Sequence, residues 1–171
     1  MSTKTAILAS VPLCALLLAC SGPAPQEDAS GDQAPTPAEP AAFAVDVTLS
    51  DAARQQFAHS GETVIVSARY YGEPAEGIPA NAVNEVGQVD LGHTEVELHG
   101  GGRARFDGSA ILPSRRTWIS GGPQVEVSVF SGRNSSPDNL LDCDPYQGPL
   151  PGEPLAINCR LIGGEESAAA Q

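Results

Sequence analysis

The chain has 171 residues, and its 21 aspartates and glutamates outnumber nine lysines and arginines, which gives a formal net charge of −12. Proteins that bind nucleic acid or lie flat on anionic lipid need clustered positive charge, so this balance argues against both functions. Residues 43–163 carry strand-like patterns, and a segment of this length is enough for one domain with one core.

The first residues predict a leader that is removed. Lys4 precedes an apolar run over residues 6–18. Thirteen residues of helix span about 20 Å, whereas a bilayer core is about 30 Å thick and takes about 20 apolar residues. The run is therefore too short to cross a membrane, and it is typical of a signal peptide over residues 1–19.

The leader ends in Leu17-Leu18-Ala19-Cys20, which Ser21 and Gly22 follow. This stretch resembles the lipobox of bacterial lipoprotein signal peptides. The resemblance implies that the chain is cut before Cys20 and that this cysteine carries covalent lipid. The alternative is an ordinary secretory leader, in which Cys20 is incidental.

The same resemblance implies a location. Two or more acyl chains hold a protein stably on a membrane, at about 0.8 kcal/mol per buried methylene. In Gram-negative lipoproteins a serine such as Ser21 after the modified cysteine favours the periplasmic face of the outer membrane over retention in the inner membrane. The alternative is the outer face of the plasma membrane, which is where Gram-positive lipoproteins are anchored.

Residues 20–42 predict an acylated cysteine followed by a disordered tether. Residues 21–42 hold five prolines, six alanines and four acids, which leaves nothing to build a core. A flexible chain of this length has an end-to-end distance of about 25 Å. Residues 164–171 are likewise predicted to be a disordered tail. Loss of Lys4 with the leader takes the formal charge of the mature chain from −12 to −13.

The first half of the domain predicts a strand, a short helix and a second strand. Residues 43–49 alternate apolar and polar side chains, as a strand with one wet face does. Ser50 is a candidate N-cap for a helix over residues 51–59, and Gly61 is a candidate stop signal. The clearest strand covers residues 63–71. Its alternate apolar side chains share one face: Val64, Val66, Ala68 and Tyr70.

A loop over residues 72–84 follows, and the rest of the domain predicts further short strands separated by turn signals. These strands are expected at residues 87–91, 94–98, 103–111, 124–130 and 155–162. Together the patterns predict an all-β fold with about six or seven strands and one short helix. The expected architecture is an antiparallel β-sandwich of immunoglobulin-like or transthyretin-like type.

Cys143 and Cys159 are the two cysteines left once Cys14 goes with the leader and Cys20 takes lipid. An even pair in an oxidising compartment predicts a disulfide, and closing a loop of about 16 residues stabilises the fold by about 3 kcal/mol. The alternative is two reactive thiols, which the spacing disfavours because it is not C-x-x-C.

Chemical motifs are scarce. There is no G-x-S-x-G, H-E-x-x-H or P-loop sequence, and the histidines are His59, His93 and His99. Asp90, His93 and His99 are an alternative metal set, but we expect the two later histidines to face solvent at strand ends. Three acids, Asp138, Asp142 and Asp144, crowd one loop. Turn formation explains this loop better than calcium binding, because the spacing lacks the EF-hand glycine and glutamate. Calcium binding stays an open alternative.

Arg115 and Arg116 form the basic spot of the domain, and Trp118, the single tryptophan, lies beside them. Arginine and tryptophan are frequent at the centres of protein interfaces, which makes these three residues the candidate partner surface. The alternative is that Trp118 fills the core at a strand end while the arginines face water.

These observations predict a lipid-anchored envelope lipoprotein that is not an enzyme and that binds or supports another periplasmic or outer-membrane component. We expect no metal, no nucleic acid and no cofactor beyond the covalent lipid on Cys20. The expected partner is a protein or the cell wall. The alternative function is an inhibitor or immunity protein against a cell-wall hydrolase such as a lysozyme-like enzyme, with the segment between Cys143 and Cys159 as the inserted element.

Overall fold

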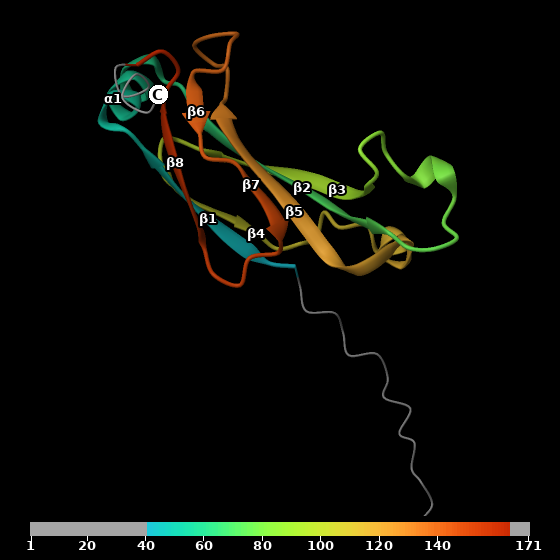
Figure 1. The fold of residues 1–171 in the computed structure, drawn as a ribbon. Coiled ribbons are helices and arrows are strands. Elements are labelled where there is room, and N and C mark those ends of the chain that lie inside the picture. Colours follow the sequence, from blue (N-terminus) through green and yellow to red (C-terminus); the bar gives the residue numbers. More distant parts are fainter. Residues whose placement is uncertain (1–40, 165–171) are drawn as a thin grey trace, which may run out of the picture. The chain divides into compact units, whose positions relative to one another are not determined.

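The computed structural model describes residues 41–164. The predicted signal peptide, the Cys20 lipidation site, residues 20–40 of the predicted tether and residues 165–171 of the predicted tail lie outside this range. Within it, the strands form two four-stranded sheets that pack against each other, as Figure 1 shows. The protein domain is therefore an all-β sandwich, as the alternating patterns predict.

The first sheet has the strand order β4-β1-β8-β6. Its strands are β1 (Phe43–Leu49), β4 (Gly102–Phe106), β6 (Leu141–Cys143) and β8 (Leu155–Leu161). β1 pairs antiparallel with β4, and β8 pairs antiparallel with β6, but β1 and β8 run parallel. The sandwich is thus antiparallel except at this central pair.

The second sheet has the strand order β3-β2-β5-β7 and is antiparallel throughout. Its strands are β2 (Val64–Pro74), β3 (Val89–Leu98), β5 (Ile119–Ser131) and β7 (Tyr146–Pro149). β2 and β5 form the long central antiparallel pair of this sheet. On one face they carry the buried side chains of Val64, Val66, Val125 and Val127.

The structure corrects several predicted boundaries. The described residues hold eight strands, which is more than predicted, because β6 and β7 are too short to be recognised from a sequence pattern. Residues 72–74 extend β2 instead of beginning a loop. The two strands predicted on either side of Gly92 are one strand, β3, with an irregularity opposite Tyr70 and Tyr71. Gly92 has a φ of 131°, and a Cβ there would lie 2.1 Å from the carbonyl oxygen of Ala110, so the irregularity requires glycine.

The helix α1 (Asp51–Ser60) begins where the sequence predicts and runs one residue further, up to the predicted stop at Gly61. The Ser50 hydroxyl accepts a hydrogen bond from the backbone N–H of Ala53 at 3.3 Å, and Gly61 ends the helix in the left-handed conformation at φ 70°. Ala53 and Phe57 are the buried residues of the helix, which therefore covers one end of the sandwich. Among residues 41–164, no helix combines the length and the apolar character that crossing a membrane requires.

The core lies between the sheets and is built from alternate residues of β1, β2, β4, β5 and β8. Phe43 contacts two aromatic neighbours, stacking on Phe106 at 4.9 Å and meeting Tyr70 edge to face at 6.3 Å between ring centroids. Tyr70 is fully buried. Among residues 41–164, its hydroxyl is the one buried side-chain oxygen or nitrogen without a hydrogen-bond partner. Burial, and secondarily the charge of Asp107, raises the pKa of Tyr70 to about 12.

The sandwich has two distinct ends (Figure 1). We call one the helix end: it comprises α1, the turn at residues 99–101 and the connection at residues 132–140. We call the other the loop end: it comprises residues 75–88 and 107–118, which include the 3-10 helices η1 (Ala80–Ala82) and η2 (Pro113–Trp118). Ala41 lies against Gly108, so the described chain enters the domain at the loop end.

Candidate functional site

The loop end holds a cleft of about 330 Å³ between η1, η2 and the start of β3. Polar groups of Asn81, Asn84, Asp90 and Arg115 line it together with the indole of Trp118. Two of the three residues of the predicted partner surface, Arg115 and Trp118, therefore meet in one concave site. The other lining residues lie within residues 81–90, and nothing in the sequence indicated that they approach Arg115 and Trp118.

Arg115 fastens η2 to β3. Its Nη1 donates hydrogen bonds to the backbone oxygen of Asp90 at 2.8 Å and to the Asp90 carboxylate at 3.0 Å. The backbone N–H of Leu112 donates to the oxygen of Leu91 at 2.8 Å, and that of Ala75 donates to the oxygen of Trp118 at 2.9 Å. The segments that form the cleft are thus fastened to the sheet by hydrogen bonds on both sides.

Trp118 reaches both the core and the cleft. It is half-buried and packs against the hydrophobic core, and it also lines the cleft. Arg115 is neutralised by Asp90, whereas Arg116 takes part in none of the five ion pairs found among residues 41–164. Arg116, which follows Arg115 in the chain, is half-buried and does not line the cleft.

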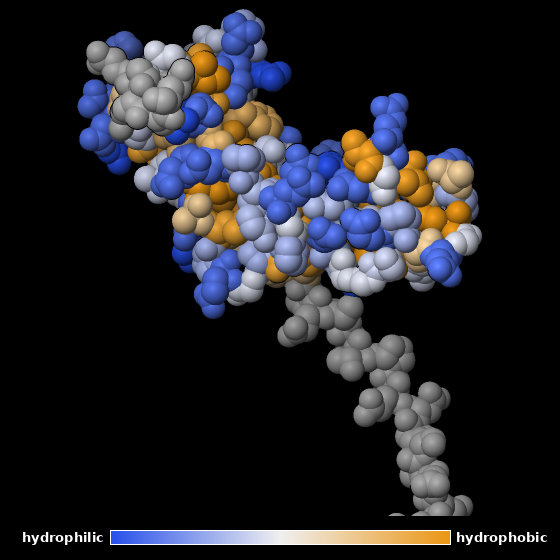
Figure 2. All heavy atoms as spheres, in the orientation of Figure 1, coloured by the Kyte–Doolittle hydropathy of each residue, from blue (hydrophilic) through white to orange (hydrophobic). Residues whose placement is uncertain are grey.

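Two exposed apolar side chains lie on the loops that contribute to the cleft, although neither lines it. Val86 is 73% exposed and Leu112 is 44% exposed. Asn84 fixes the turn that carries Val86, because its Oδ1 accepts hydrogen bonds from the backbone N–H groups of Val86 at 3.1 Å and Gln88 at 2.8 Å. Figure 2 shows hydrophobic residues gathered at this end, over the loop that follows β2. The turn is therefore held by hydrogen bonds while it keeps the Val86 side chain in solvent.

A larger cavity of about 590 Å³ lies at the helix end, between α1 and the turn at residues 99–101. Its walls are mainly apolar, from Leu49, Phe57 and Ala58. The charged groups beside it have partners within the domain: Arg54 is ion-paired with Asp51, and Glu62 is fully hydrogen-bonded. We therefore place the candidate site at the smaller cleft, whose loops also carry exposed apolar side chains that remain for a partner.

Glu62 is a structural anchor of the helix end. Its side chain is buried, and its two oxygens accept hydrogen bonds from the N–H groups of Thr63 at 3.1 Å, Asn134 at 3.0 Å and Ser135 at 2.8 Å, and from the Ser135 hydroxyl at 2.6 Å. Burial alone would raise the pKa of Glu62, but the hydrogen bonds from Ser135, Asn134 and Thr63 outweigh it and lower this pKa to about 2. The carboxylate thus ties the connection after β5 to the start of β2.

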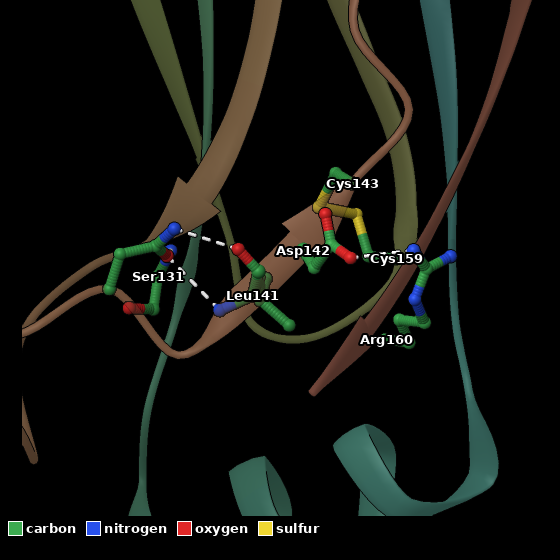
Figure 3. Close-up of a disulfide and its surroundings, with 7 residues drawn as sticks. Ser131, Leu141, Asp142, Cys143, Cys159 and Arg160 are labelled. Atoms are coloured by element: carbon green, nitrogen blue, oxygen red, sulfur yellow. Dashed lines mark hydrogen bonds and ion pairs between the residues drawn. A yellow bond between two sulfur atoms is a disulfide. The ribbon is translucent and has the colours of Figure 1, made fainter. Parts of the chain in front are cut away.

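The predicted disulfide is present. Cys143 of β6 and Cys159 of β8 lie directly opposite each other in antiparallel strands, and their sulfur atoms are bonded (Figure 3). The next cross-strand pair, Asp142 and Arg160, forms an ion pair at 2.6 Å. The bond therefore holds the short edge strand β6 on β8.

The remaining candidate residues are dispersed. His59, His93 and His99 are exposed, on α1, on β3 and in the turn after β3. In the acidic loop, Asp142 pairs with Arg160. Asn139, which the sequence did not single out, shapes this loop, because its Oδ1 accepts hydrogen bonds from the N–H groups of Ser131 and Leu141. No cluster of three or more potential metal ligands occurs among residues 41–164.

Comparisons with protein-family models, with curated proteins and with solved structures found no match for this chain. The site is therefore interpreted from its own geometry. The Arg115, Arg116 and Trp118 cluster gave a sequence signal for it, whereas its contacts with Asp90 and Asn84 depend on the way loops far apart in sequence meet.

Proposed function

We propose that this protein is a lipid-anchored binding module of the bacterial envelope, without enzymatic activity, that holds a protein or cell-wall partner at its loop end. The observation that carries the proposal is the pair of exposed side chains, Val86 and Leu112, on hydrogen-bonded loops beside the cleft of Trp118. Covering an exposed valine or leucine on a partner contributes up to about 2 kcal/mol for each residue. The half-buried Trp118 in the cleft is the type of residue that dominates interface energies.

The lipid anchor is supported by the sequence of residues 17–22 alone. We propose that Cys20 carries the lipid and that the anchor is in the periplasmic face of the outer membrane. The described chain begins at the loop end.

The alternative function, inhibition of a cell-wall hydrolase by a projecting loop, finds no favouring observation. Much of the segment between the two cysteines is not a projecting loop, because Tyr146–Pro149 form β7 and pair with β5, and residues 155–158 belong to β8.

The binding proposal is tested with tagged full-length protein crosslinked in intact cells. We expect the double substitution Val86→Ser and Leu112→Ser to reduce capture of a discrete partner at least tenfold. The matched control is Ile162→Ser, which removes a side chain that is 57% exposed at the helix end, and it should leave capture unchanged. Equal capture by the double variant and by the wild type would contradict the proposed surface.

The anchor is tested separately by intact-mass spectrometry and by fractionation. We expect the mature chain to begin at Cys20 and to carry the mass of its acyl chains. Replacement Cys20→Ser should release the protein from the envelope. An unmodified Cys20 thiol in membrane-bound protein would refute the anchor and leave the binding surface to be judged by the first test.

A further inference from the structure

The free edge of β3 is a second feature of the molecule that can bind a partner. β3 is the first strand of its sheet, and β2 is its one neighbour there. From outside the sheet, the Leu112 N–H reaches the oxygen of Leu91. Among residues 41–164, no other loop or turn backbone hydrogen bond involves β3, so residues 93–97 form an uncovered stretch that begins next to the cleft.

The direction of the backbone groups in this stretch follows from the strand pairing. The N–H of Ser131 donates to Asn139, away from β2, and Ser131 lies opposite Val64. Since the groups of successive residues alternate in direction, those of Val64 turn toward β3 and bond with Leu98. The backbone groups of Leu98, Val96 and Thr94 therefore face β2. The backbone N–H and C=O groups of the residues between and before them face outward: His93, Glu95 and Glu97.

The side chains along this edge define the charge of a suitable partner. Glu95 and Glu97 are exposed, and the β2 residues opposite them are Ser67 and Ile65, which carry no charge. Neither glutamate takes part in the five ion pairs found among residues 41–164. Arg69, the nearest arginine along β2, is bound to Glu126 of β5. The edge is therefore acidic and its charge is not neutralised within the domain.

Two other occupants fit this edge poorly. An antiparallel second copy centred on Glu95 would place Glu95 against Glu95, and one centred on residue 96 would place Glu95 against Glu97, which like-charge repulsion disfavours. The segment at residues 21–42 of the chain itself has five prolines, which lack the N–H group that a strand donates, and it has acids but no basic residue.

We propose that the β3 edge binds an extended basic segment of the partner as an added strand, with lysine or arginine side chains opposite Glu95 and Glu97. The inference rests on the proposed binding function and names the chemistry of the partner. The half-buried inner-face residues of the same strand, Val96 and Leu98, require small apolar side chains at the alternate positions of the added strand. Backbone hydrogen bonds supply the affinity, and the alternating side chains supply the choice of partner.

The test uses the full-length chain and a capped seven-residue peptide that alternates lysine and valine. Fluorescence anisotropy measures binding, and hydrogen exchange locates it. We expect slowed exchange at residues 93–97. Binding should weaken at least tenfold when the peptide is N-methylated at alternate amides, because an N-methylated strand cannot pair. A peptide with glutamate in place of lysine should not bind.

Two variants of the protein complete the test. Glu95→Pro removes an N–H that is not used in pairing with β2 and should abolish peptide binding. The double substitution Glu95→Lys and Glu97→Lys, which leaves the backbone intact, should reverse the preference toward the glutamate peptide. The matched control is Glu85→Lys with Glu153→Lys, two exposed loop acids, and it should leave peptide binding within twofold of the wild type.

Each contrary outcome is distinct. Equal binding by the charge-reversed and wild-type proteins, or protection that maps away from residues 93–97, would overturn the inference. A wild-type dimer in sedimentation that Glu95→Pro dissociates would assign the edge to a second copy and would also overturn it. The cleft substitutions Val86→Ser and Leu112→Ser should not affect peptide binding, so failure of the edge proposal is distinguishable from failure of the proposed function.

Discussion

The two ends of the sandwich are held differently. A buried carboxylate and a disulfide hold the helix end, where Ile162 is exposed, whereas the Arg115–Asp90 contact and backbone hydrogen bonds hold the loop end, where Val86 and Leu112 are exposed. At the helix end, buried Glu62 accepts four hydrogen bonds and the Cys143–Cys159 disulfide holds β6. At the loop end, Val86 and Leu112 are exposed, and the Tyr70 hydroxyl beneath it has no partner among the described residues. The difference supports the proposal that the loop end, and not the more strongly fastened helix end, is the binding end.

The largest expected effect on stability is that of Glu62→Gln. The substituted amide has one acceptor oxygen, and its NH₂ group faces N–H donors, so the free energy of unfolding at pH 7 should fall by about 3 kcal/mol. Because the folded pKa of about 2 lies below the usual 4.5, this contribution is present above about pH 5 and is lost as the pH falls toward 2. Urea unfolding across this range should therefore show a shallower acid loss for the variant than for the wild type.

A control for this measurement is Glu85→Gln, which changes an exposed loop glutamate and should alter stability by less than about 0.5 kcal/mol. Parallel acid profiles of the Glu62→Gln variant and the wild type would contradict the anchoring role of Glu62.

Removal of the disulfide should lower stability by a similar amount. With Cys143→Ser and Cys159→Ser together, the closed loop of 16 residues is opened, and the chain-entropy model predicts a loss of about 3 kcal/mol. The β2–β5 pairing should remain, because the bond acts on β6 at the other sheet. Hydrogen exchange that rises at residues 141–143 before it rises in β5 would confirm this; a simultaneous loss of protection in both would argue against a local role.

Tyr70→Phe tests the opposite kind of site. The hydroxyl is buried without a partner among the described residues, and removing it leaves the ring contacts with Phe43 in place. We expect stability to rise by up to about 1 kcal/mol. Thermal unfolding of the two proteins side by side measures the change, and a loss of more than 1 kcal/mol would show that the hydroxyl has a partner in solution.

The smallest expected effect on stability is that of Val86→Ser with Leu112→Ser. Both side chains are exposed, so the free energy of unfolding should change by less than about 0.5 kcal/mol even though partner capture is lost. A large destabilisation would mean that these residues support the loops rather than offer a contact surface.

Local sequence rules predicted the parts of the fold that depend on short-range physics. The strand β1, the capped helix α1 and the buried face of Val64, Val66 and Ala68 follow from alternation and capping, and each is confirmed. The disulfide follows from the number of cysteines once Cys14 and Cys20 are assigned to the leader and the lipid. The glycine pattern near residue 92, in contrast, was interpreted as a break, although Gly92 keeps one strand continuous through an irregularity.

Contacts between distant segments could not be predicted from one sequence. β6 and β7 have three and four residues, too few to show a period, and they exist because β8 and β5 supply the pairing. The bond from Arg115 to Asp90 and the burial of Glu62 also depend on tertiary contacts, over 25 residues in the first case and 73 in the contact with Ser135. The arginine–tryptophan cluster indicated the position of the candidate site but not its concave shape.

The central claim is that the loop end, rather than the helix end, contacts the partner in the envelope. It is tested most directly by placing a photo-crosslinking amino acid at residue 112 or at residue 162 of the full-length protein and irradiating intact cells. The account predicts a discrete adduct from residue 112 and none from residue 162, although Ile162 is the more exposed of the two side chains. An adduct from residue 162 with none from residue 112 would contradict it.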